Sequence, residues 1–224
     1  MTKQQVTVPE PGVRELAHRL AFNLAREQLA GVSDIEEQCR KSGAAYLPDR
    51  KIISIEHLNR AYNISYPDGE VTLTGSDETV PLRDKILVLH YLTRAKGTPL
   101  TGKMITYKEL HDGLNYYPTF FKRAIEPVIK RYKDEPQKLI WAGKKLGGVK
   151  ADYGDAGVTI PAFPRVPLTF VLWQGDKEFA ADGNIMFDST ISDYLPTEDI
   201  TILSEVIAWR LARLSKDGGD SPGY

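Results

Sequence analysis

The chain has very little cysteine, and that scarcity excludes several kinds of site. Cys39 is the only cysteine among 224 residues, so internal disulfides and iron–sulfur or zinc sites built from several thiolates are excluded within this chain. No stretch approaches the roughly 20 apolar residues of a membrane span, and residues 1–10 lack the apolar core of a signal peptide. We therefore expect a cytoplasmic protein in a reducing compartment, with no membrane partner.

Histidine is also scarce, which argues against the commonest catalytic and zinc motifs. No two histidines are spaced as a helical zinc site requires, no Gly-x-Ser-x-Gly motif is present, and Cys39 lacks a readable histidine partner. His90 lies four residues after Ile86 in the most apolar helical segment. It is therefore either a core imidazole that bonds to a carbonyl or a ligand to a cofactor metal. His57 has a weaker claim because it lies beside a predicted turn.

Neither sign of charge is in excess over the whole chain. The net charge is -1, which gives no support to nucleic-acid binding. Locally, basic residues dominate residues 122–150 and acidic residues dominate residues 151–200. These two segments either pair with each other across the fold or form a surface that steers an anionic ligand.

Helical periodicity is clear in several segments. Apolar residues recur at helical spacing after Pro11 and predict an amphipathic helix that ends near Gly31: Val13, Leu16, Ala17, Leu20, Leu24 and Ala25. The capping-box pattern of residues 33–36 predicts that Ser33 caps a second helix, which carries Cys39 as a packed thiol. Further helices are expected over residues 81–97, 121–132, 137–146 and 196–214.

Alternating apolar residues predict two groups of strands. One group covers residues 53–73 as an antiparallel meander, with a turn at Pro67-Asp68-Gly69, and the other covers residues 156–187. Sequential strands between helices indicate an α+β fold, a single domain over residues 11–215 with an antiparallel sheet packed against several helices. Residues 1–10 are expected to be a flexible N-terminus and residues 216–224 a disordered tail.

Two short motifs suggest ligand sites. Residues 97–104 match a phosphate-binding loop except at Met104, where a magnesium-binding Ser or Thr is required, and a helix rather than a strand precedes them. The apolar run that ends at Trp173 delivers Asp176 and Glu178 to a glycine-bearing turn. This pattern is typical of an ordinary strand-ending turn and also of a ligand site at a sheet edge.

Acidic residues are dense after Trp173, and their oxygens suit a hard divalent cation. The set comprises Asp176, Glu178, Asp182, Asp188, Asp193, Glu198 and Asp199. Their spacing does not match a calcium-binding loop, and several have structural roles available at turns and helix starts. A divalent-cation-dependent enzyme remains one hypothesis.

Several segments in order resemble one known protein family. They are residues 90–97, 99–103, 164–167, 172–179 and 193–199, which include His-Tyr-Leu, Pro-Leu-Thr-Gly-Lys and Asp-Tyr-Leu-Pro-Thr-Glu-Asp. The chain resembles the domain of unknown function 3786 found in anaerobic bacteria and archaea, over most of its length from the first helix to the last. Some members of that family carry an iron–sulfur module similar to that of corrinoid proteins, which this chain lacks.

The resemblance implies an accessory protein of anaerobic one-carbon metabolism that binds a small anionic or corrinoid-type tetrapyrrole cofactor. It implies a pocket lined by Lys103, Arg123, Arg165, Trp173, Asp176 and Glu178. His90 or His57 is then the candidate axial ligand. The alternatives are the cation-dependent enzyme and a protein–protein adaptor without catalysis, whose basic and acidic segments are docking surfaces.

Overall fold

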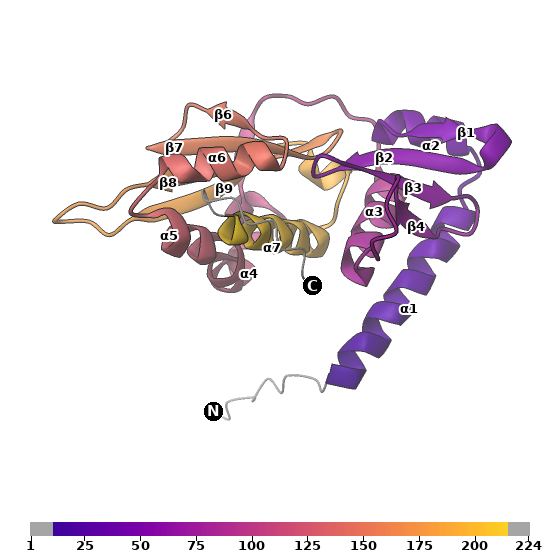
Figure 1. Ribbon diagram of the computed structural model, residues 1–224, viewed down its shortest axis with the longest axis horizontal. Helices are drawn as coiled ribbons and strands as arrows, with labels where there is room; N and C mark the ends of the chain where they lie inside the picture. Colours follow the sequence, from indigo (N-terminus) through magenta and orange to yellow (C-terminus); the bar gives the residue numbers. More distant parts are fainter. Residues whose placement is uncertain (1–10, 215–224) are drawn as a thin grey trace.

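The computed structural model describes residues 11–214 as two halves that lie side by side (Figure 1). Residues 11–94 form the first half, drawn in indigo and purple, and residues 104–213 form the second. One connection, residues 95–103, joins the last helix of the first half to the first strand of the second. The predicted flexible N-terminus and disordered tail lie outside the described residues.

The first half is a four-stranded antiparallel sheet with three helices. Its strand order is β1-β2-β3-β4, and Ile53 pairs with Ile64 across β2 and β3. The elements are α1 (Pro11–Ala30), α2 (Ile35–Ser42), β1 (Ala45–Leu47), a 3₁₀ turn (Pro48–Arg50), β2 (Ile52–His57), β3 (Arg60–Ser65), β4 (Val71–Leu73) and α3 (Leu82–Arg94). The alternation of buried and less buried residues along β2 and β3 is the two-residue period that predicted them.

The β2–β3 hairpin anchors the first half to the second. Leu58 and Asn59 both have left-handed backbones, with φ of 50° and 60°, as a two-residue type I′ hairpin requires. Leu58 is nonetheless buried, and its amide donates to the Ala162 carbonyl of the second half at 3.2 Å. The hairpin tip is therefore held by packing between the halves.

The second half is a five-stranded antiparallel sheet, in the order β5-β9-β8-β7-β6, with four α-helices. Its elements are β5 (Met104–Thr106), a 3₁₀ turn (Tyr107–Glu109), α4 (Gly113–Phe120), a π-helical segment (Phe121–Ile125), α5 (Glu126–Tyr132), α6 (Gln137–Lys145), β6 (Val149–Ala151), β7 (Ala156–Phe163), β8 (Val166–Trp173), β9 (Asp182–Asp188), a 3₁₀ turn (Ile191–Asp193) and α7 (Thr197–Arg213). β8 is central, and its nearly continuous burial explains its uninterrupted apolar run.

A glycine allows α6 to lie against the sheet. A Cβ at Gly143 would come within 2.3 Å of a methyl carbon of Val158 on β7, so only glycine fits without a shift. α6 packs on β7, and α5 contacts β9. The close approach of α6 to β7 thus depends on a residue without a side chain.

The buried apolar side chains of both halves form one continuous core. Aromatic rings link the halves: Phe163 on β7 stacks on Tyr91 of α3 with ring centroids 4.2 Å apart, and on His57 of β2 at 4.3 Å. The Tyr91 hydroxyl donates to the Ser42 carbonyl and accepts from the Arg165 amide. Residues far apart in sequence therefore meet where the two halves join, which we call the junction.

The α+β class predicted from the sequence is confirmed, with two differences in detail. The strands divide between two antiparallel sheets, where the sequence analysis expected one, because the meander and the later strands belong to different halves. The cap of α2 is Asp34 rather than Ser33, since the Asp34 side chain accepts from the Glu37 amide at 2.9 Å.

Candidate functional site

The residues predicted to line one pocket lie in three separate places. Trp173, Asp176 and Glu178 are at the far end of the second sheet, where β8 leads into β9. Lys103 and Arg165 are at the opposite end, beside the starts of β5 and β8. Since an eight-residue strand spans roughly 25 Å, side chains at the two ends of β8 do not share a pocket.

The far-end residues form a solvent-exposed turn. Asp176 accepts from the amides of Phe179 at 2.8 Å and Glu178 at 2.7 Å, and these bonds hold the pKa of its carboxyl below the usual value. Trp173 is 42% exposed and pairs with Asp182 across the hairpin. This is the strand-ending turn that the sequence analysis gave as the alternative to a ligand site.

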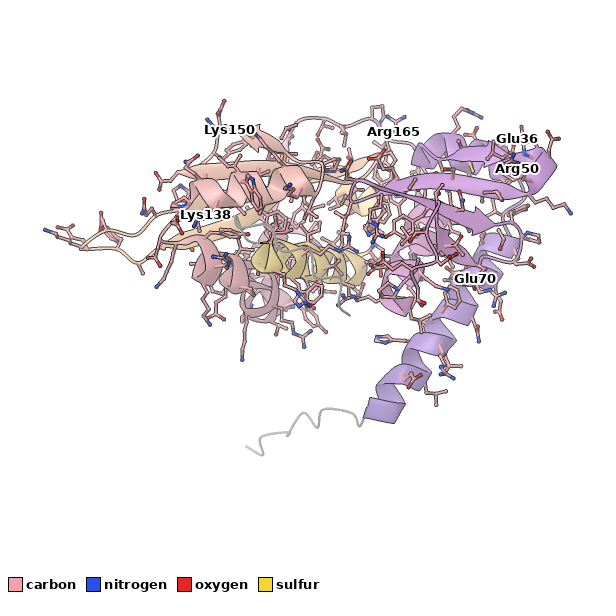
Figure 2. The ribbon with its side chains drawn as sticks, viewed as in Figure 1. Glu36, Arg50, Glu70, Lys138, Lys150 and Arg165 are labelled. Atoms are coloured by element: carbon pink, nitrogen blue, oxygen red, sulfur yellow. The ribbon has the colours of Figure 1, made fainter. Side chains whose placement is uncertain are left out.

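Arg123 lies apart from both groups. It projects from the π-helical segment and forms an exposed ion pair with Glu205 of α7 at 3.4 Å. Lys103 and Arg165 are exposed near the junction, and Figure 2 shows Arg165 on the surface where the two halves meet. Of the three predicted cations, Lys103 and Arg165 therefore lie at the same end of the second sheet, and Arg123 does not.

His57 is the core histidine of the protein. Its side chain has no solvent exposure, and Nδ1 donates to the Ala162 carbonyl at 2.8 Å, which leaves Nε2 as an acceptor. Burial lowers the pKa of His57 to about 3, so the ring is neutral in the folded protein at neutral pH. The sequence analysis gave a core imidazole bonded to a carbonyl as one alternative for His90. In the structure, His57 is the histidine in that environment.

His90 is partly exposed and pairs with a carboxylate. Its Nδ1 lies 2.8 Å from Oδ2 of Asp199, which is buried at the start of α7. A carboxylate on one ring nitrogen fixes the orientation of the imidazole and of its other nitrogen, an arrangement common behind metal-ligating histidines. The sequence analysis named Asp199 as a helix-start residue and as a member of the acidic set, but the 109-residue separation from His90 hides their contact.

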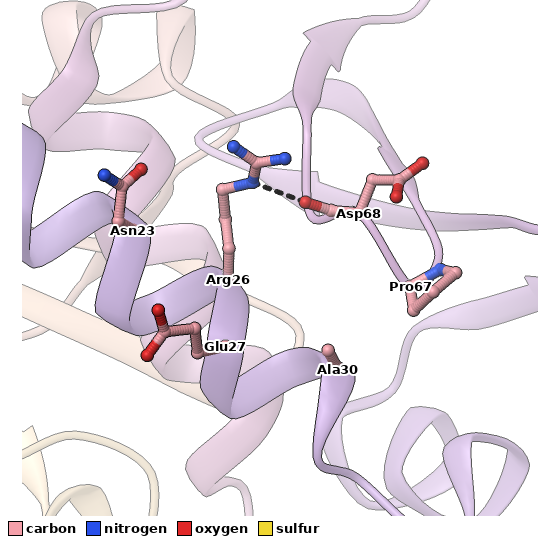
Figure 3. Close-up of a pocket in the computed structure, with 6 residues that line it drawn as sticks. All are labelled: Asn23, Arg26, Glu27, Ala30, Pro67 and Asp68. Atoms are coloured by element: carbon pink, nitrogen blue, oxygen red, sulfur yellow. Dashed lines mark hydrogen bonds between the residues drawn. The ribbon is translucent and has the colours of Figure 1, made fainter.

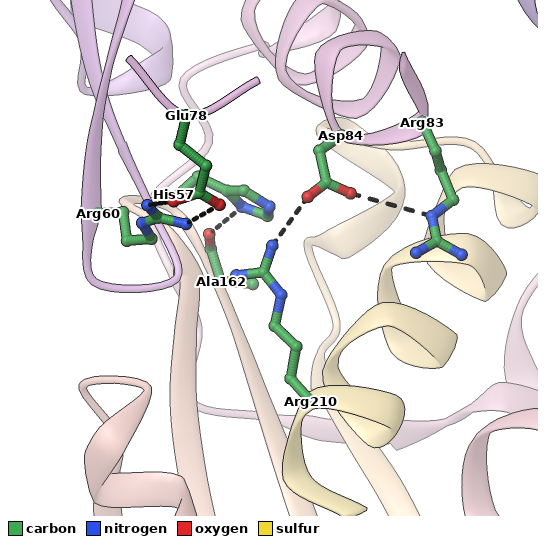
Figure 4. Close-up of polar contacts among 7 residues, drawn as sticks. All are labelled: His57, Arg60, Glu78, Arg83, Asp84, Ala162 and Arg210. Carbon is green, nitrogen blue, oxygen red and sulfur yellow. Dashed lines mark hydrogen bonds and ion pairs between the residues drawn. The ribbon is translucent and has the colours of Figure 1, made fainter. Parts of the chain in front are cut away.

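A second polar pair joins α3 and α7 near His57 (Figure 4). Asp84 is 2% exposed and accepts from Arg210 Nη2 at 2.8 Å. Asp84 Oδ1 and His57 Nε2 are the two buried side-chain atoms in the described part of the chain that have no hydrogen-bond partner. Both atoms are acceptors, so the interior of the junction has fewer donors than acceptors.

The first helix carries two apolar faces on nearly opposite sides. Phe22, Ala25 and Leu29 form an inner face that is buried in the core. Leu16, Leu20 and Leu24 form an outer face, and they are 59%, 61% and 54% exposed. At about 100° per residue the two sets point roughly 180° apart.

The outer face lies on a projecting element. The N-terminal part of α1 extends away from the body of the protein (Figure 1). Every residue from 15 to 20 is exposed. The sequence analysis predicted this helix and its end correctly, but it treated all the apolar residues as one stripe. The opposite directions of the two sets were the signal that it missed.

A depression lies beside the C-terminal part of α1 (Figure 3). It has a volume of about 370 Å³ and is lined by Asn23, Arg26, Glu27, Ala30, Pro67 and Asp68. Across the depression, Arg26 Nε donates a hydrogen bond to the Asp68 carbonyl. The wall opposite the helix is therefore the β3–β4 turn.

Clusters of metal ligands and membrane-spanning helices are both absent from the described residues. Over residues 11–214, no three His, Cys, Asp or Glu side chains gather closely enough to hold a metal ion. Within that range no helix is long and apolar enough to cross a membrane. Cys39 is buried, and burial raises the pKa of its thiol to about 11, which fits the predicted packed thiol.

Comparison with protein families decides the relationship of the chain. The model of the domain of unknown function (DUF3786) matches residues 34–210. The chain belongs to this family. No curated protein and no solved structure matches.

The matched region includes the junction, both histidine sites and all eight predicted site residues, but it begins after α1. The sequence analysis had extended the resemblance to the first helix, which the match does not support. The projecting outer face of α1 therefore lies outside the part of the chain that defines the family.

Proposed function

We propose that this protein is an accessory protein that works by binding another protein chain through the outer face of α1. The observation that carries the proposal is the exposure of Leu16, Leu20 and Leu24, each more than half exposed, on a helix whose opposite side is packed in the core. Apolar residues on both sides of a helix are typical of a helix that is covered on both sides.

The size and continuity of the outer face support docking rather than chance exposure. Single exposed leucines are ordinary on protein surfaces, whereas three on successive turns make a contiguous patch of a few hundred Å². The polar candidates of the sequence analysis fit structural contacts instead: Asp176 closes a turn, and Arg123 pairs with Glu205. The proposal develops the adaptor hypothesis, with an apolar helix face in place of the charged segments.

The test is quantitative co-purification from the host that naturally makes the protein. We expect Leu20→Glu to deplete the associated protein chains, because a charge on the outer face cannot be buried without cost. Leu114→Glu is the matched control, since Leu114 is a 68% exposed leucine on α4. Equal recovery of associated chains with both variants would contradict the proposal.

A second candidate function is the binding of a small anionic or corrinoid-type tetrapyrrole cofactor. The family resemblance implied such a role in anaerobic one-carbon metabolism. The observation in its favour is the contact of His90 Nδ1 with Asp199, which would orient Nε2 toward a metal. Lys103 and Arg165 would bind acidic groups of the ligand near the junction.

Visible spectroscopy of the anaerobically purified protein tests this candidate, with cobalamin and haem added in turn. It predicts a spectral shift and added native mass that His90→Ala abolishes. An unchanged spectrum with both cofactors would remove the candidate.

A further inference from the structure

We infer that the chain that covers the outer face of α1 is a second copy of this protein, with the two α1 helices antiparallel. This inference rests on the proposed function, and it names the partner. A two-fold axis brings the same patch of both copies together, so one apolar ridge can supply both sides of the contact.

The leucine spacing fits a helix–helix contact. Leu16, Leu20 and Leu24 are each four residues apart and form a single i±4 ridge, the kind that interdigitates with a like ridge in the commonest helix packing. With the axis between Leu20 and Leu24, Leu20 of each copy lies against Leu24 of the other. The ridge is therefore complementary to itself in the antiparallel direction.

Charges on the flank of the ridge favour the same arrangement. Arg19 and Glu27 lie on one side of the ridge, eight residues apart. An antiparallel pair brings Arg19 of each copy near Glu27 of the other, because its two-fold axis keeps this flank of both copies on the same side of the contact. In a parallel pair the two flanks lie on opposite sides, so Arg19 and Glu27 of different copies do not meet. Glu27 has no ion pair with any residue in the described range, and Arg19 contacts Glu15 at 2.6 Å.

The depression extends the contact beyond the leucines. It lies beside Glu27 and Ala30 of α1 (Figure 3). In the antiparallel pair, Leu16 of one copy points toward the depression of the other. This contact adds to the leucine patch, which alone falls short of the roughly 800 Å² per partner of a standard interface.

A lipid surface fits this helix less well. Helices that lie on membranes carry Lys and Arg on their polar face. The charged positions of α1 are mixed in sign instead: three are arginines and two are glutamates, namely Arg14, Glu15, Arg19, Arg26 and Glu27. Mixed charge of this kind suits a protein surface of the same pattern.

The first measurement is the native mass of the purified protein by analytical ultracentrifugation, from about 1 to 200 µM, the range in which a modest interface dissociates. We expect a monomer–dimer equilibrium that rises to twice 25.1 kDa. Leu20→Glu should weaken the dimer by at least about tenfold. Leu114→Glu should leave it unchanged. Circular dichroism confirms that both variants are folded.

Charge exchange then tests the antiparallel arrangement. Arg19→Glu and Glu27→Arg should each weaken their own dimer, because each creates two like-charge contacts. An equimolar mixture of the two variants restores both opposite-charge contacts and should recover dimerisation. Glu15→Gln is the control, since it removes the Arg19 contact within the chain without altering the contact between copies.

Each outcome decides the inference. A Leu20-dependent dimer with rescue in the mixture supports it. A dimer that is insensitive to Leu20→Glu, a dimer without rescue, or a monomer at every concentration overturns it. If the protein is a monomer but a different protein chain co-purifies with it and is lost in Leu20→Glu, the proposed function stands and the inference fails. Binding of α1 to lipid vesicles would overturn the proposed function and the inference.

Discussion

The junction and the outer face of α1 both reverse the usual distribution of polar and apolar groups. The junction buries Asp84 and His57 between the two halves, with the 20% exposed Arg210 beside them, whereas α1 exposes three leucines to solvent. At the junction, nearly every polar group finds a partner elsewhere in the chain. On the outer face of α1, the described part of the chain supplies no cover for the leucines.

This difference distinguishes unusual residues that stabilise the fold from unusual residues that are available for binding. A buried charge is expensive unless it is paired, and the pairing of Asp84 with Arg210 explains why both residues can lie between α3 and α7. An exposed apolar ridge has no such explanation within residues 11–214. We therefore assign the buried polar residues of the junction to the stability of the fold. We assign the exposed leucines of α1 to assembly with another chain.

The largest expected effect comes from breaking the junction pair. Arg210→Met removes the closer of the two cations beside the buried Asp84 carboxylate and leaves Arg83 at 3.9 Å, which should cost up to about 3–5 kcal/mol in the free energy of unfolding. Urea denaturation measures the change. The double variant Asp84→Leu and Arg210→Met should recover most of the loss, and a double variant as unstable as the single one would show that the pair is not coupled.

Acid should weaken the junction through His57. The unfolded chain binds a proton there below about pH 6.5, whereas the folded protein does so only near its lowered pKa of about 3. Stability is therefore complete above pH 6.5 and falls as the pH decreases, by about 2 kcal/mol between pH 6.5 and pH 5.

The measurement is urea unfolding at several pH values. His57→Gln should be less stable overall but should lose this component of the pH dependence. His18→Gln, which changes an exposed histidine of α1, should retain it. An identical pH dependence in all three proteins would contradict the role of His57.

A smaller effect is expected at the rim of the junction. Arg60 bonds to Glu78 through two contacts of 3.2 and 2.5 Å, but both side chains are partly exposed. Arg60→Gln should therefore lower the free energy of unfolding by less than about 1 kcal/mol. Added salt should reduce the difference from the wild type. A loss as large as that of Arg210→Met would show that burial does not separate the two pairs.

The smallest effect on stability is expected from the outer face. Leu20→Glu removes no intrachain packing, so the dilute monomer should unfold within about 0.5 kcal/mol of the wild type. Ala25→Glu is the contrasting variant, because Ala25 on the inner face has no exposure. It should destabilise the protein strongly. Similar losses for the two variants would contradict the distinction between the faces.

Periodicity predicted the major helices and strands because it reports local burial. α3 and β8 were found in this way, one as an all-round apolar helix and the other as an apolar run. β1 and β6 were missed, since neither of these three-residue strands shows an apolar alternation. The division into two sheets depends on which strands pair, and no local pattern encodes it.

The candidate sites were less predictable because they depend on long-range contacts. His57 becomes the core histidine through Ala162, and His90 pairs with Asp199, partners that are 105 and 109 residues away. Trp173 and Arg165 are close in sequence, yet they lie at opposite ends of β8 because the strand is extended. The outer face of α1 could have been predicted from the sequence by assigning its apolar residues to two opposite sides of the helix.

Photo-crosslinking from the outer face tests the central claim most directly. A photoreactive amino acid at position 20, introduced in the natural host, should form adducts with a protein chain, and one at position 149 should not. Val149 is the control because it is 65% exposed on β6 of the second half. An adduct of twice the mass of the chain identifies a second copy. The absence of protein adducts at position 20 would contradict the account.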